Sequence, residues 1–209
     1  LFTSDNGGTP RAVNAPLRGF KASTWEGGIR GPTIAWWPGK IPAGASSGAI
    51  ASMMDVLPTF AKLGGGIVPS DRKIDGIDLW PVLSGKAQES GREAFYYFRG
   101  PTLEAVRSGP WKLHLIARGP TGPKAKQAKD PGELPPILHN LDGDTGETRN
   151  VAVANPDVVK RLQALADKMG VDLGGTQFGA GSRPLGRVEK PQPLIGRDGK
   201  IRAGFEPGR

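Results

Sequence analysis

The sequence predicts an α/β fold at its N-terminal side, followed by a small antiparallel β-sheet that a helix covers. Residues 1–4 have the pattern of a strand end and lead into a glycine-rich loop. Residues 55–63 carry apolar side chains at helical spacing. Between residues 94 and 141, short β-branched and aromatic runs alternate with Gly and Pro, which is typical of hairpins. Two parts of different architecture are therefore expected.

The N-terminal part contains a further strand candidate and two helix candidates. Residues 32–37 are short and β-rich, and their two tryptophans are interpreted as core. Asp55 is expected to cap the first helix with a structural role, and Gly64 is expected to end it. A short helix is expected at 79–83 after a turn.

The C-terminal part changes to strand-like runs, at 95–98, 104–107, 111–115 and 137–141. They predict a small antiparallel sheet with an edge strand at the last run. A helix is expected to begin at Asn155, with Pro156 in its first turn, and to end at Gly170. Its apolar stripe is expected to pack on the sheet.

The predicted organisation has three units. Residues 1–90 form part of an α/β catalytic domain, 91–173 form the sheet-and-helix subdomain, and 174–209 form an extended Gly/Pro-rich tail. Hydrophobic residues make up only 37% of the chain, and Gly 32 with Pro 20 is a composition that favours irregular segments.

Charge and cysteine content exclude several classes of function. The formal net charge is +8, but the basic residues are dispersed and do not interleave with aromatic side chains, so specific nucleic-acid binding is not expected. The chain has no Cys, which excludes disulfides and thiolate metal sites within it. No apolar run approaches the ~18–20 residues needed to span a bilayer.

The candidate site lies in the first glycine-rich loop. Asp5 and Asn6 are adjacent hard oxygen donors of the kind that Ca²⁺ or Mg²⁺ takes, and the two glycines after them permit a sharp turn. Lys21 adds a compact cation that could meet an oxyanion held by such a metal. Taken singly, the loop is typical of a turn and the lysine of a solvated surface. Their combination indicates an anion-handling metal site.

Several motifs resemble, in order and spacing, the C-terminal half of a type I sulfatase, close to the arylsulfatase A group. The stretch Trp25-Glu26-Gly27-Gly28-Ile29-Arg30 is one of them. The others lie at 2–8, 17–21, 37–41, 54–59, 74–79, 105–107, 111–114, 141–142 and 146–148. The resemblance implies an alkaline-phosphatase-like α/β fold and the hydrolysis of a sulfate ester.

The resemblance also implies roles for particular residues. Asp5 and Asn6 match metal ligands, Lys21 matches a lysine that contacts the sulfate, and His114 matches a histidine near the mouth of the substrate pocket. Ca²⁺ is the expected ion, with Mg²⁺ possible, and Glu26 is expected to orient Lys21 or to cap the following turn. His139 is interpreted as structural.

The nucleophile implied by the resemblance is formylglycine, which is made within a Cys-x-Pro-x-Arg or Ser-x-Pro-x-Arg motif. Neither motif occurs here, so the chain is expected to be a C-terminal fragment that is inactive alone. An aryl or carbohydrate sulfate is the expected substrate, and a periplasmic, secreted or lysosome-like location is the expected setting. The oligomeric state stays open.

Two other functions remain open from the sequence. A phosphodiesterase or phosphonate hydrolase on the same scaffold would use the same metal-on-oxyanion chemistry. A non-catalytic module that binds sulfated or acidic polysaccharide would use the positive charge and need no nucleophile.

Overall fold

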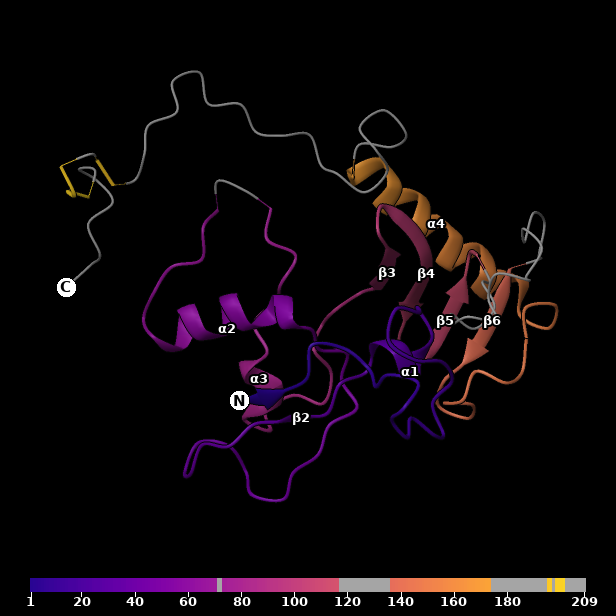
Figure 1. Cartoon of the computed structure of the whole chain (residues 1–209), viewed down its shortest axis with the longest axis horizontal. Helices are drawn as coiled ribbons and strands as arrows, with labels where there is room; N and C mark the ends of the chain where they lie inside the picture. Colours follow the sequence, from indigo (N-terminus) through magenta and orange to yellow (C-terminus); the bar gives the residue numbers. More distant parts are fainter. Residues whose placement is uncertain (71–72, 117–135, 174–194, 197, 202–209) are drawn as a thin grey trace.

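The computed structural model describes residues 1–70, 73–116, 136–173, 195–196 and 198–201. The elements, in chain order, are β1 (Phe2–Thr3), α1 (Glu26–Ile29), β2 (Thr33–Ile34), η1 (Met53–Asp55), α2 (Val56–Leu63), α3 (Trp80–Leu83), β3 (Phe95–Arg99), β4 (Thr102–Ser108), β5 (Trp111–His114), β6 (Ile137–Asn140) and α4 (Pro156–Asp172). Figure 1 shows β2, α2 and α3 on one side and the antiparallel sheet with its covering helix on the other, with α1 next to the sheet.

The first two strands form a two-stranded antiparallel sheet, in which Phe2 lies opposite Ile34. The second strand is shorter than the predicted 32–37. The core interpretation of its tryptophans is wrong for both, since Trp36 is 80% and Trp37 45% exposed. Trp37 contacts Trp80 in a tilted arrangement with ring centroids 5.5 Å apart. A sheet of two short strands is too narrow to cover both rings.

Asp55 has the expected structural role, although it does not cap α2 through its side chain. Its Oδ2 accepts from the backbone N–H of Ser52 at 2.7 Å, which forms a capping box on η1. Its Oδ1 accepts from Ile77 N at 2.8 Å and pairs with Arg92. The fully buried carboxylate therefore joins three segments, and α2 ends at Gly64 as predicted.

The C-terminal part is a four-stranded antiparallel sheet in the order β3-β4-β5-β6, as predicted. The helix α4 lies across one face, over β4 and β5 (Figure 1). The core between them contains Val106, Leu113, Leu138 and Leu162, each with no exposed surface. Alternating side chains on the strands and one stripe of the helix account for this packing.

The end of α4 differs from the prediction. The helix continues through Gly170 to Asp172, and Leu173 N still donates to Met169 O at 3.0 Å. A glycine inside a helix costs about 1 kcal/mol but does not end it. Here the Asp172 carboxylate also pairs with Lys73 Nζ at 2.6 Å, which holds the last turn against the N-terminal part.

The predicted tail, 174–209, lies outside the described residues except for 195–196 and 198–201, where Ile195 bridges Ile201. The domain boundaries at 90 and 173 stay predictions. In the described ranges, α4 and the other helices lack the length and apolar character that a membrane span requires.

Candidate metal and anion site

Backbone hydrogen bonds bring the two predicted site segments together. Gly7 N donates to Gly28 O at 3.0 Å, and Lys21 N donates to Gly8 O at 2.8 Å. The loop that carries Asp5 and Asn6 is therefore bonded both to α1 and to the residue that carries the candidate sulfate contact. These two hydrogen bonds fix the backbone near Asp5 and Asn6 relative to the backbone of Lys21.

Glycine is required where these backbones meet. A Cβ added to Gly7 would lie 2.0 Å from Gly27 O, which no side chain tolerates. Gly19 has a φ of +82°, in the left-handed region that glycine adopts without strain. The glycine-rich composition of this region follows from backbone packing against backbone.

The structure places Asp5 and Lys21 side by side. Lys21 Nζ lies 3.9 Å from Asp5 Oδ2, and the two side chains are 51% and 79% exposed. At such exposure the pair contributes little stability, at most about 1 kcal/mol. A carboxylate and an ammonium held together at an open surface are available for a ligand.

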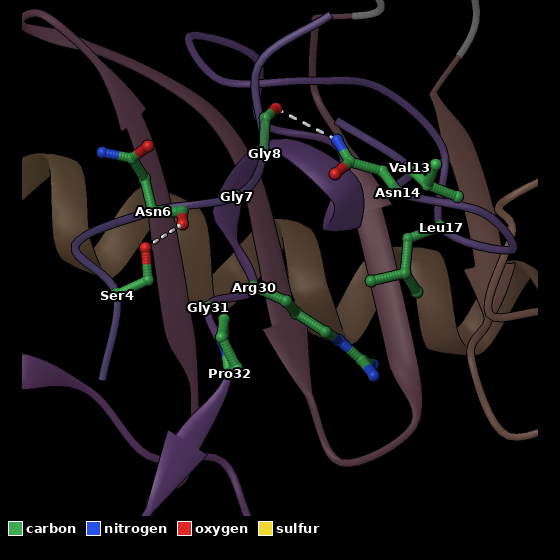
Figure 2. Close-up of a pocket in the computed structure, with 10 residues that line it drawn as sticks. All are labelled: Ser4, Asn6, Gly7, Gly8, Val13, Asn14, Leu17, Arg30, Gly31 and Pro32. Carbon is green, nitrogen blue, oxygen red and sulfur yellow. Dashed lines mark hydrogen bonds between the residues drawn. The ribbon is translucent and has the colours of Figure 1, made fainter. Parts of the chain in front are cut away.

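Asn6 lines an adjoining pocket of about 470 Å³, together with Asn14 and Arg30 (Figure 2). Its backbone carbonyl accepts a hydrogen bond from Ser4 Oγ at 3.0 Å, which steadies the loop. In Figure 2 the Asn6 side chain points away from Asn14, so its amide is not used in tying the loops together.

The donor set fits a divalent cation in part. Asp5 and Asn6 offer hard oxygens, as Ca²⁺ and Mg²⁺ prefer, and Ca²⁺ takes about 6–8 of them. Within the described ranges no cluster of three or more His, Asp or Glu side chains could hold a metal. The described residues can therefore supply two ligands, and a complete site needs others.

Behind the loops lies a buried cluster of charged side chains: Glu26, Lys112, His114 and Glu147. Lys112 Nζ lies 2.8 Å from Glu26 Oε1 and 3.0 Å from Glu147 Oε1, and it donates to Thr24 O at 2.7 Å. Glu147 Oε2 accepts from Glu26 N at 2.7 Å, at the first turn of α1. Two carboxylates and one ammonium thus join α1 to β5 and to the turn after β6.

Of the two roles expected of Glu26, orienting Lys21 does not match the contacts of its side chain. Its carboxylate accepts instead from Arg30 Nε at 2.6 Å, Tyr97 Oη at 3.2 Å and Lys112. Burial alone would raise the pKa of Glu26, but the charge and hydrogen bond of Lys112, with Arg30, outweigh it and hold that pKa at about 2. The ionised carboxylate is a structural anchor of α1.

His114 lies in the buried cluster, with 1% of its surface exposed. Its Nε2 is 2.8 Å from Glu147 Oε1, and its ring packs on Trp25 with centroids 4.0 Å apart. Burial lowers its pKa to about 4, with Lys112 adding to the effect and Glu147 opposing it, so the ring is neutral at pH 7. Contact of His114 with substrate stays a prediction, since the ring is shielded here.

His139 has the structural place expected of it. It lies in β6, 1% exposed, and its Nδ1 is 2.9 Å from Arg149 O. The ring thereby ties the last strand to the turn that carries Glu147.

Sequence reasoning missed three residues of this region. Lys112 and Glu147 each lie inside a motif stretch, but a charged residue in a strand or a turn normally indicates solvent. Asn14 lies between two motifs and looks like an ordinary turn residue. The sequence signal that could have indicated Lys112 and Glu147 was their position within the matched motifs at 111–114 and 146–148.

Comparisons with known proteins agree with this architecture. The Sulfatase family profile matches residues 1–67, and the profile described as the C-terminal region of aryl-sulfatase matches residues 90–184. N-acetylgalactosamine-6-sulfatase of Canis lupus familiaris is 39% identical over 188 residues, which cover 78% of this chain and 35% of that protein. Arylsulfatase A of Homo sapiens is 34% identical over 211 residues, which cover 88% of this chain and 41% of that protein.

Solved structures show the same relationship. The PsFucS1 sulfatase from Pseudoalteromonas sp. superimposes with a TM-score of 0.66 at 31% identity, over 80% of this chain and 36% of that one. Ps i-CgsB gives a TM-score of 0.66 at 29% identity, over 80% and 35%. The chain spans roughly a third of these proteins, and the predicted alkaline-phosphatase-like α/β fold is confirmed for that part. On the two family profiles, the relatives and the shared fold, the chain belongs to the type I sulfatase family.

Proposed function

We propose that this chain is the C-terminal part of a sulfuric ester hydrolase, in which Asp5 and Asn6 bind a divalent cation and Lys21 contacts the sulfate. The observation that carries the proposal is the 3.9 Å approach of Lys21 Nζ to Asp5 Oδ2 at an exposed surface. Other acidic side chains of the region, such as Glu26 and Glu147, are buried in ion pairs.

The chemistry of sulfate transfer needs such a pair. Negative charge on the oxygens around sulfur must be stabilised in the transition state, and a fixed cation beside the reacting group does this without reorganisation. Ca²⁺, or Mg²⁺, would supply Lewis acidity at this place. Lys21 would hold an ammonium against a sulfate oxygen, and the hydrogen bond from its backbone N–H to Gly8 O fixes the backbone from which this side chain extends.

The nucleophile would come from outside this chain. Formylglycine is the expected group, and the sequence contains no Cys from which it could be made. The chain spans 35–41% of the two relatives described above, so most of a comparable enzyme lies elsewhere. We expect this chain alone to be inactive.

The expected substrate is an aryl or carbohydrate sulfate. Relatives named N-acetylgalactosamine-6-sulfatase and a structural neighbour determined in complex with k-i-k-neocarrahexaose favour the carbohydrate class. A periplasmic, secreted or lysosome-like location stays the expected setting. The named relatives are sulfatases, which favours sulfate esters over the phosphoester and polysaccharide-binding alternatives.

The test is a Lys21→Ala substitution in the complete polypeptide that contains this sequence. Turnover of an aryl sulfate should fall by on the order of 10²–10³, the scale for losing one preorganised partner of a developing oxyanion. Lys160→Ala, an exposed lysine on α4, is the matched control and should leave turnover unchanged. A rate for Lys21→Ala within a few fold of the parent contradicts the assignment of this residue.

A further inference from the structure

We propose that Asn14 is a positioning residue that fixes Lys21 relative to Asp5 and Asn6. The inference rests on the proposed function, and it concerns a residue that has no place in the predicted site. Asn14 is half-buried in the wall of the pocket that Asn6 also lines (Figure 2).

The side-chain amide of Asn14 reaches three backbone carbonyls at once. Its Nδ2 lies 3.1 Å from Gly8 O, 3.0 Å from Gly19 O and 3.0 Å from Gly27 O. Figure 2 shows the amide aimed at Gly8. One carbonyl follows the candidate metal ligands, one precedes Lys21, and one belongs to α1. A single side chain therefore holds together the three segments that build the site.

The link to Lys21 runs through one atom. Gly8 O accepts from Asn14 Nδ2 and also from the backbone N–H of Lys21, at 2.8 Å. A shift of this carbonyl would move both the loop that carries Asp5 and the residue that carries the ammonium. The hydrogen bond of Leu17 N to Asn14 O, at 2.8 Å, fixes the Asn14 backbone in a tight turn.

An uncharged amide suits this position. Three converging carbonyls present lone pairs, and an NH₂ group brings two hydrogens and no negative charge. The carboxylate introduced by Asn14→Asp would turn an oxygen toward those carbonyls and remove the donor that they share. The neighbouring Gly8 is matched to the amide as well, since a Cβ there would lie 2.2 Å from Asn14 Oδ1.

Asn14 contacts the site through backbone carbonyls, so removing its side chain should shift the position of Lys21. A displacement of about 1 Å at a reacting group can cost on the order of 10²-fold in rate. We expect Asn14→Ala to lower kcat/KM by roughly 10- to 100-fold, and Asn14→Asp to lower it at least as much.

A double-mutant cycle with Lys21→Ala in the complete polypeptide separates positioning from general destabilisation. If Asn14 works by placing Lys21 relative to the Asp5 loop, the fold loss caused by Asn14→Ala should be at least about 3-fold smaller once Lys21 is already Ala than in the parent. Equal fold losses in both backgrounds would overturn the proposal. Asn155→Ala is the matched control, because its Nδ2 also donates to a backbone carbonyl, that of Val151, far from the site.

Amide hydrogen exchange provides a readout that does not depend on turnover. Asn14→Ala should speed exchange at the N–H groups of Gly7 and Lys21 by about 10-fold or more and leave Leu113 in β5 unchanged. Unchanged exchange at both sites overturns the inference even where Lys21→Ala is costly. If Lys21→Ala leaves turnover unchanged, the proposed function is overturned instead. The hydrogen bonds of Asn14 would then have no catalytic role.

Discussion

Lys112 Nζ lies 2.8 Å from Glu26 Oε1, and neither side chain is more than 1% exposed. This pair joins β5 of the C-terminal sheet to α1, directly after the loop that carries Lys21. The region around α1 and the C-terminal sheet are therefore connected by a buried ion pair as well as by the chain. Glu147, 3.0 Å from the same ammonium, extends the connection to the turn after β6.

Removal of the Lys112 ammonium should destabilise the protein strongly. Lys112→Met would leave Glu147 buried without its ammonium partner and Glu26 with Arg30 and Arg107 as its cationic partners. Breaking a buried pair by removing one partner costs about 3–5 kcal/mol. Denaturant unfolding of the complete polypeptide would measure the loss, with Lys160→Met as an exposed control. A loss below about 1 kcal/mol would show that the cluster does not hold the two parts together.

Acid should weaken the same cluster in two steps. The pKa of His114 is lowered from 6.5 to about 4, so the unfolded chain binds a proton before the folded one, and stability is lost as the pH falls from about 6.5 to 4. The pKa of Glu26 is lowered from 4.5 to about 2, so its contribution is lost as the pH falls from about 4.5 to 2.

The first step is isolated by a His114→Gln substitution. Between pH 6.5 and 4 the melting temperature of the parent should fall, and its free energy of unfolding should fall by at most about 3 kcal/mol. The melting temperature of the variant should depend less on pH over this range. The same pH dependence in both proteins would contradict the assignment of the shifted pKa to His114. Comparison of the slopes, rather than of absolute stability, removes the effect of losing the Glu147 hydrogen bond.

Asp5→Ala should lower divalent-cation affinity in the complete polypeptide, since one charged ligand is lost from the coordination sphere. Calorimetric titration with Ca²⁺ after chelation should show a weakening of about 10-fold or more. Asp157→Ala, an exposed acid in the first turn of α4, is the matched control. Unchanged Ca²⁺ affinity in Asp5→Ala would remove this residue from the proposed site.

Gly7→Ala should damage the site without removing any functional group. The added methyl would meet Gly27 O at 2.0 Å, so the loop after Asn6 must move away from α1. We expect loss of activity of about 10-fold or more, together with reduced Ca²⁺ affinity. Gly48→Ala, where nothing lies within 4 Å, should match the parent, and full activity in Gly7→Ala would show that the tight approach is dispensable.

The sheet and its helix could be predicted from the sequence because their signals are local. Alternating apolar residues such as Val106 and Leu113 mark strands, and the stripe around Leu162 marks the covering helix. The predicted end of α4 is wrong because Gly170 resembles a stop signal, whereas the helix continues to Asp172 and Leu173 N donates to Met169 O.

The candidate site was only partly predictable. Asp5, Asn6 and Lys21 could be selected because their chemistry is visible in the residue types. Lys112 could not, since its partner Glu147 lies 35 positions away and only the fold brings them together. The same reason hid Asn14, whose three acceptors lie in two loops and in the short helix α1.

A crystal structure of the complete polypeptide with Ca²⁺ and a bound sulfate ester tests the proposed site most directly. The proposed function predicts side-chain oxygens of Asp5 and Asn6 on the cation and Lys21 Nζ hydrogen-bonded to a sulfate oxygen. A cation held entirely by other residues, with Lys21 directed into solvent, would contradict it.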